Sequence, residues 1–192
     1  MIAALSDGNL CPRIANGPNP KHYYKDVWCL AHADNGYPGA FPKGFMNLFL
    51  RRWNGTRRLM LFSGSFKNKG WTTVDVNPNL HPKYVLNAEQ LPEDWTERFD
   101  LVFADPPYSE REAEEMYGLP YFNLVKVVNE MARVTSTGGH MALLHRLVPQ
   151  VFPGDTLHFK RMKIVGVVGI YTLSGYSNIR ALTVWRKSEG LI

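Results

Sequence analysis

The stretch FDLVFADPPY, residues 99–108, decides the fold of this chain. Its first six residues form an apolar run without regular polar alternation, which is typical of a strand buried on both faces of a parallel sheet. Two prolines then end the strand, because proline has no backbone N–H to donate and fixes its own φ. The sequence therefore predicts a stiff loop, with Asp105 at its start and Tyr108 at its end. Open α/β sheets bind ligands at this end of their strands.

Apolar and β-branched runs elsewhere predict the rest of a sheet. They lie at residues 58–62, 71–76, 84–86, 140–147, 163–172 and 181–186. Apolar residues at helical spacing predict a helix over residues 46–53 and a longer one over residues 121–134. The last two strands are expected to form an antiparallel pair. Strands that alternate with helices before such a pair indicate an α/β fold whose sheet is mostly parallel.

The chain has 192 residues, of which 45% are hydrophobic, and this suits one domain with a substantial core. We expect that domain over residues 37–192. Residues 1–36 are rich in Pro, Gly and Asn and show no sustained helical or strand period. They are predicted to be an irregular N-terminal arm.

Composition restricts the classes of function. No apolar stretch approaches the roughly 18 residues of a membrane span, and the first nine residues do not resemble a secretory signal. Cys11 and Cys29 are too few for a disulfide framework, so a cytoplasmic location is expected. Together with His22 and His32 they fit no usual zinc spacing, and no metal is expected. The net charge of +5 is compatible with a polyanionic partner.

Three successive predicted strands end in residues suited to one ligand. The first ends in Phe62, Ser63, Gly64 and Ser65, where a glycine lets backbone N–H groups approach a ligand closely. The second ends in Asp75 and Val76, and an acidic side chain there can accept hydrogen bonds from the two hydroxyls of a ribose. The third is followed by Asn87 and Ala88, which could face an adenine ring.

The loop at residues 105–108 suits methylation of an exocyclic amino group on a base. Such a nitrogen is a poor nucleophile, because its lone pair is delocalised into the ring. Hydrogen bonds from its N–H groups to Asp105 and to the Pro106 carbonyl would favour a pyramidal nitrogen, while Tyr108 would stack on the base. Alignment of the nitrogen with the methyl donor is then the main catalytic device. A base in a duplex must first be flipped out, at a cost of a few kcal/mol.

These residues resemble the amino-methyltransferase branch of the Rossmann-like, S-adenosylmethionine-dependent methyltransferases. Asp105, Pro106, Pro107 and Tyr108 match the family's catalytic DPPY motif. Residues 62–65 match its cofactor loop in part, and Asp75 matches its acidic ribose ligand. Residues 37–45, with Tyr37, Pro38 and Phe41, resemble a motif that helps enclose the methionine part of the cofactor. The resemblance implies S-adenosyl-L-methionine as cofactor and the N6 amino group of adenine in DNA as substrate, with N4 of cytosine as a near variant.

The chain also departs from the family pattern. Phe66 stands where the second glycine of the cofactor loop is expected. Residues 63–70, between the first two strands, are too few for the usual helix, and so are residues 77–83. We therefore expect reduced helix content on one face of the sheet. The N-terminal arm, a second copy of the chain or a partner subunit could cover that face.

Nucleic-acid contacts are predicted from basic and aromatic residues near the strand ends. The candidates are Lys67, Lys69, Tyr176, Ser177 and Asn178. DNA is favoured, and a compact enzyme of this kind would suit a phage or mobile element. One alternative is methylation of a base amino group in ribosomal or transfer RNA. Another is a catalytically silent relative that binds nucleic acid or a protein partner.

Overall fold

The protein folds around one eight-stranded sheet in the computed structural model, which describes residues 24–33, 40–148, 158–172 and 179–190. The strand order is β1-β7-β8-β6-β5-β2-β3-β4. Only β8 runs antiparallel to its neighbours, between β6 and β7. The prediction of a mostly parallel α/β sheet with an antiparallel C-terminal pair is confirmed. The strands are β1 (Tyr24–Leu30), β2 (Arg58–Leu61), β3 (Trp71–Asp75), β4 (Tyr84–Val85), β5 (Phe99–Ala104), β6 (Thr135–His145), β7 (Met162–Thr172) and β8 (Ile179–Lys187).

Three α-helices accompany this sheet: α1 (Phe45–Arg52), α2 (Glu110–Tyr117) and α3 (Leu124–Val134). The first and third correspond to the two predicted helices. The third begins three residues later than predicted, because the Asn123 side chain caps it by accepting a hydrogen bond from the Lys126 N–H at 3.2 Å. Short 3₁₀ turns occur at Pro78–Leu80, Glu93–Trp95 and Phe159–Arg161. No helix in the described ranges is long and apolar enough to cross a membrane.

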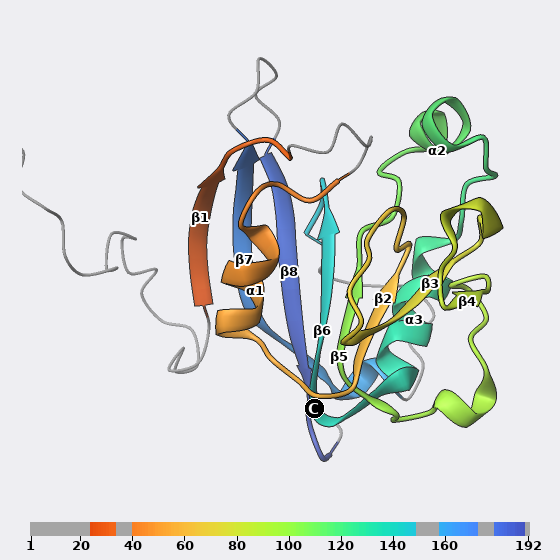
Figure 1. The fold of residues 1–192 in the computed structure, drawn as a ribbon. Coiled ribbons are helices and arrows are strands. Elements are labelled where there is room, and N and C mark those ends of the chain that lie inside the picture. The colour runs from red at the N-terminus through yellow and green to blue at the C-terminus, as the bar shows by residue number, and fades with distance from the viewer. Residues whose placement is uncertain (1–23, 34–39, 149–157, 173–178, 191–192) are drawn as a thin grey trace, which may run out of the picture.

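The sheet separates two apolar layers. Successive side chains of a strand point to opposite faces, so Leu59 and Leu61 pack in the layer with α3, while Met60 packs in the layer with α1. Phe45 and Phe49 are the fully buried residues of α1. Each face is thus closed by one short α-helix together with loops that carry large side chains (Figure 1).

Residues 63–70 and 77–83, which were predicted to be too short for a helix, contain no α-helix. Between β2 and β3 the chain forms turns, and between β3 and β4 it forms only the 3₁₀ turn at Pro78–Leu80. Phe66 helps to cover the sheet there, because its ring packs edge to face against Phe41 at 5.9 Å and against Trp71 at 5.8 Å. The reduced helix content of this face is confirmed, and aromatic side chains take the place of the helix.

One part of the predicted N-terminal arm belongs to the sheet. The expectation of an irregular arm is wrong for Tyr24–Leu30, which forms β1 and pairs in parallel with β7. Figure 1 shows it at the edge of the sheet, beside the much later β7. Trp28 anchors the strand through edge contacts with Phe45 at a centroid distance of 6.1 Å. Residues 1–23 lie outside the described part of the chain, and a domain beginning at residue 37 remains a prediction.

Candidate functional site

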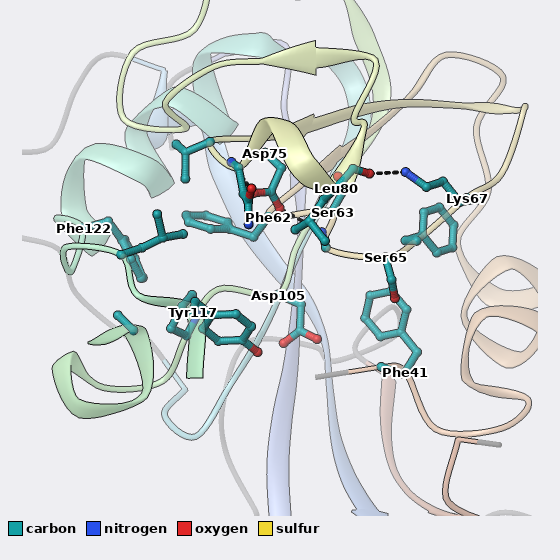
Figure 2. A pocket seen from close by; sticks show the side chains of 18 of the residues that line it. Phe41, Phe62, Ser63, Ser65, Lys67, Asp75, Leu80, Asp105, Tyr117 and Phe122 are labelled. Carbon is teal, nitrogen blue, oxygen red and sulfur yellow. Dashed lines mark hydrogen bonds between the residues drawn. The ribbon is translucent and has the colours of Figure 1, made fainter. Parts of the chain in front are cut away.

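A cavity of about 660 Å³ lies at the carboxyl ends of β2, β3, β4 and β5. Its volume falls within the range of roughly 300–1,000 Å³ that is usual for small-molecule sites. The segment before α1 forms one side and the segment from α2 to Phe122 forms the other (Figure 2). Its wall includes Phe41, Phe62, Ser63, Gly64, Ser65, Lys67, Asp75, Val76, Leu80, Asn87, Asp105, Pro107, Ala113, Tyr117, Tyr121 and Phe122.

The turn after β2 forms the floor of the cavity. Phe62 has a φ of +53° and Gly64 a φ of +51°, so the chain leaves the strand through two left-handed residues. The Phe62 conformation costs of the order of 1–3 kcal/mol, because it is unfavourable for a residue with a Cβ. Ser63 between them is buried, and its hydroxyl has no hydrogen-bond partner among the described residues. The turn thus presents a polar group that a ligand can satisfy.

Asp75 fastens this turn to the loop after β3. One carboxylate oxygen accepts the Gly64 N–H at 2.8 Å and the other accepts the Asn77 N–H at 3.0 Å. The residue is 9% exposed and lines the cavity. A carboxylate has about four acceptor positions, so two remain for a ligand. This is the arrangement that an acidic residue needs to hold a pair of hydroxyl groups.

Aromatic rings close two sides of the cavity. Phe122 packs against Phe62 at a centroid distance of 4.9 Å and against Tyr121 at 4.8 Å. On the other side Phe41 stacks on Phe45 at 5.3 Å and 17°. Flat apolar walls of this kind favour a planar ring system between polar groups at the floor and at Asp105.

Asp105 projects into the cavity from the loop after β5 (Figure 2). Burial raises the pKa of its carboxyl to about 6, while the nearby charge of Arg180 and a hydrogen bond from Tyr108 act in the opposite direction. The Tyr108 hydroxyl donates to the Asp105 carboxylate at 2.7 Å, and Arg180 donates to the Tyr108 oxygen at 3.2 Å. The carboxylate is therefore held by a chain of two hydrogen bonds that starts on β8.

Tyr108 itself is not among the residues that line the cavity. Its ring packs edge to face on His145 at 5.5 Å and 81°, and the Arg146 guanidinium lies 5.4 Å from its centroid. Its backbone N–H donates to Glu112 at 2.8 Å, and Glu112 forms an ion pair with Arg146. Neither His145 nor Arg146 lines the cavity wall. Both act on the site through Tyr108.

The structure brings most of the predicted site residues together. The cavity wall contains the predicted cofactor residues Phe41, Phe62, Ser63, Gly64, Ser65, Asp75, Val76, Asn87 and Asp105. Ala88 is buried in the apolar core beside α3. Tyr37 and Pro38 lie outside the described residues.

Some of the remaining predicted residues also line the cavity, and the others do not or lie outside the described residues. Of the catalytic tetrapeptide, Asp105 and Pro107 line the cavity, whereas Pro106 and Tyr108 do not. Lys67 lines it too, and its ammonium donates to the backbone carbonyls of Leu80 and His81. Lys69 lies in a separate hollow beside Arg58 and Trp71. Tyr176, Ser177 and Asn178 lie outside the described residues.

Several residues of the site were not predicted from sequence. Helix α2, which carries Ala113 and Tyr117, begins with Ser109 three residues before Glu112, and the Ser109 hydroxyl accepts the Glu112 N–H at 3.2 Å. That Ser-x-x-Glu spacing is a helix-start signal that could have revealed it. Phe122 was assigned to the apolar face of a helix, but it precedes α3 and lines the cavity. Arg180 carries no local signal of its role.

Neither a protein-family model nor a curated protein sequence matches the chain. Solved structures do. The N-methyltransferase NodS from Bradyrhizobium japonicum WM9, in complex with S-adenosyl-l-homocysteine, is 16% identical, with a TM-score of 0.52 and coverage of 75% of this chain and 84% of that one. The cyclase SpnF is 13% identical, with a TM-score of 0.52 and coverage of 84% and 88%. A protein that converts a disulfide bond into a thioacetal group during echinomycin biosynthesis is 14% identical, with a TM-score of 0.53 and coverage of 76% and 82%.

These three structures carry different activities on similar sheets. A fold of this kind is therefore compatible with more than one reaction, and the residues of the cavity must decide among them. At identities of 13–16%, the similarity establishes a Rossmann-like α/β fold for this chain.

Proposed function

We propose that this protein transfers a methyl group from S-adenosyl-L-methionine to an exocyclic amino group of a nucleic-acid base, with N6 of adenine in DNA as the first candidate. One observation carries the proposal. The Asp105 carboxylate, an acceptor for N–H groups, shares a single cavity with Asp75 and the turn that contains Gly64. A carboxylate suited to a ribose and a carboxylate suited to an amino group thus line the same cavity.

The cofactor half of the cavity fits an adenosyl group. Asp75 keeps free acceptor positions for two hydroxyls, and the unpartnered Ser63 hydroxyl offers a further polar contact. The rings of Phe62 and Phe122 supply a flat apolar wall for a purine. S-adenosyl-L-methionine would supply an electrophilic methyl group there. That NodS is described with S-adenosyl-l-homocysteine bound is consistent with this choice.

Asp105 suits the transfer step. A carboxylate with a pKa of about 6 is mostly ionised at neutral pH, so it can accept an N–H of the amino group. As the nitrogen attacks the methyl carbon, the N–C bond forms, the carbon–sulfur bond breaks and the nitrogen releases one proton. In this proposal Asp105, which lines the cavity, would orient the nitrogen and receive that proton, and a pKa of about 6 suits this task.

Charge at the rim of the cavity suggests a path for the polynucleotide. On α2, Glu110, Glu114 and Glu115 are exposed, whereas Lys67 lies on the opposite side. Phosphates are repelled by the first side and attracted by the second. We expect the backbone to run past Lys67. RNA has the same phosphates, so methylation of an RNA base amino group remains the second candidate.

Incubation with labelled S-adenosyl-L-methionine tests the proposal. Duplex DNA, single-stranded DNA and total RNA serve as substrates, and mass spectrometry of the digested nucleosides identifies the product. N6-methyladenine in DNA is the expected result, and a methylated base amino group found only in RNA would select the second candidate. No label in any substrate, together with no cofactor binding by calorimetry, would contradict both and leave a silent relative.

Variants separate the chemistry from binding. Asp105→Asn keeps the shape of the side chain but removes its charge, so transfer should fall by at least about 100-fold while the cofactor still binds. Asp94→Asn is the matched control, because Asp94 is an exposed carboxylate on the turn Glu93–Trp95 that forms an ion pair with the exposed Arg98 at 3.4 Å. Equal loss in both variants would show that Asp105 has no special role.

A further inference from the structure

We infer that Tyr108 is a positioning residue that couples Arg180 to Asp105, and that it does not serve as the platform on which the substrate ring stacks. This inference rests on the proposed function of Asp105. The direct observation is a continuous chain of hydrogen bonds from Arg180 to the Tyr108 hydroxyl at 3.2 Å and from that hydroxyl to Asp105 at 2.7 Å. The hydroxyl donates once and accepts once, so both of its functions are used.

Other side chains already contact the Tyr108 ring, one of them over a face on which a base would have to stack. The Arg146 guanidinium lies over the ring, 5.4 Å from its centroid, and His145 meets it at 81°. The backbone of Tyr108 is fixed as well, because its N–H donates to Glu112. Among the described residues, the aromatic rings that line the cavity are other ones, those of Phe41, Phe62, Phe66, Tyr117, Tyr121 and Phe122. A planar substrate in that cavity meets these rings and not Tyr108.

Arg180 supplies the positive charge that acts on Asp105 by way of Tyr108. It lies near the start of β8 and is partly buried, so its guanidinium has lost part of its water and gains from a polar partner. The partner is Tyr108, and beyond it the carboxylate of Asp105. A positive charge near the carboxylate and a hydrogen bond to it both favour its ionised form. The coupling thus keeps Asp105 able to accept N–H groups although burial acts against its charge.

Other charged groups around Asp105 are mutually compensated. Glu112 on α2 would disfavour the charge of Asp105, but it forms an ion pair with Arg146. His145 is buried, and burial lowers its pKa, so it is neutral near pH 7. Its Nδ1 accepts the Leu147 N–H at 3.2 Å. Tyr117 also lines the cavity from α2. Arg180 is left as the main group that favours the ionised carboxylate.

The substitution Tyr108→Phe distinguishes a positioning role from a stacking role, because it keeps the ring and removes only the hydroxyl. A stacking role predicts nearly unchanged transfer. The positioning role predicts about a threefold loss of kcat at pH 6.5, approaching tenfold at lower pH, and almost no loss at pH 8.5. The acid limb of the pH profile should move upward by about one unit, since Asp105 loses a hydrogen bond that favours its charge. Tyr84→Phe, which removes a hydroxyl at the far edge of the sheet, is the control and should match the wild type.

Arg180→Gln tests the other end of the chain and should move the acid limb in the same direction. Arg180→Lys restores the charge and should recover part of the wild-type profile. Arg186→Gln is the control on the same strand, because Arg186 is exposed. Circular dichroism establishes that each variant is folded. If Tyr108→Phe does not fold, Arg180→Gln decides between the positioning role and the stacking role.

A measurement without catalysis separates this inference from the proposed function. The ¹³C resonance of the Asp105 carboxyl group, followed from pH 3 to pH 9, reports its pKa directly. Tyr108→Phe and Arg180→Gln should each raise that pKa by about one unit, while both controls leave it unchanged. An unchanged Asp105 pKa in both variants would overturn the coupling. A raised pKa in a protein that transfers no methyl group would support the coupling and refute the proposed reaction.

Discussion

Replacement of Asp75 should lower both the stability of the fold and the affinity for the cofactor. The two losses can be estimated separately from the hydrogen bonds of its carboxylate. Its carboxylate accepts the N–H groups of Gly64 and Asn77 at 2.8 and 3.0 Å. Hydrogen bonds to a charged group contribute about 1.5–3 kcal/mol each, so the pair is worth about 3–6 kcal/mol. Gly64 and Asn77 are only half-buried, and water would replace part of this in the variant.

We expect Asp75→Ala to lower the free energy of unfolding by about 2–4 kcal/mol. Asp75→Asn keeps one acceptor oxygen but turns an amide N–H₂ toward a backbone N–H, so its loss should be about 1–3 kcal/mol. Domains of this kind are stable by about 5–15 kcal/mol, so both variants should remain folded at 25 °C. Urea denaturation monitored by tryptophan fluorescence measures the differences.

Binding of S-adenosylhomocysteine gives the second readout. Loss of hydrogen bonds to two ribose hydroxyls should cost about 2–3 kcal/mol, which is a 30- to 150-fold increase in Kd by calorimetry. Asp94→Ala is the control, because that carboxylate is exposed and does not line the cavity. If Asp75→Ala lost stability but bound the ligand as tightly as the wild type, Asp75 would hold the two loops together but would not bind the ribose. If it lost less than about 0.5 kcal/mol of stability, the account of the two loops would be wrong.

Three further changes test other parts of the structure. Asp105→Asn should stabilise the protein by up to about 2 kcal/mol at pH 7.5. Burial raises the Asp105 pKa to about 6, so the cost of ionising this carboxyl in the folded state is absent below about pH 4 and fully present above about pH 6. The urea midpoints of the variant and the wild type should therefore converge in acid. Gly166→Ala would place a Cβ 2.6 Å from the ring of Trp53 and should cost about 1–3 kcal/mol in thermal unfolding, whereas Gly190→Ala, in open space, should be neutral. Lys187→Met removes a fully buried ammonium that donates to two backbone carbonyls at 2.8 Å and should cost about 3 kcal/mol in urea, because those carbonyls and an acidic partner lose their donor.

The parts of the site that sequence predicted are those set by local chemistry. A strand followed by two prolines fixes where Asp105 lies, and a glycine next to a strand end fixes where Gly64 lies. Since both strands are parallel and adjacent, their ends meet, and the cavity follows from the alternation of elements. Asp75 belongs to the same group of residues for the same reason.

The parts that sequence missed depend on partners far along the chain. The hydrogen bond that the Tyr108 hydroxyl accepts comes from Arg180, which β8 delivers from 72 residues away. The strand β1 has weak alternation of its own and is extended because β7 offers it an edge. Phe122 had the spacing of a core residue, and only the Asn123 cap moves the start of α3 beyond it. Local pattern cannot supply any of these three facts.

The pairing of β1 with β7 has a consequence for the order of folding. Trp28 lies opposite Ile170, so the first described strand cannot pair with β7 until the ribosome has released the residues up to Thr172. Contacts between residues so distant in sequence form slowly, because closing the long loop between them costs entropy. The segment Tyr24–Leu30 therefore remains unpaired, with its apolar side chains unpacked, while the centre of the sheet assembles. A nascent chain that ends before Met162 should expose this segment to chaperones, and synthesis of β7 should withdraw it.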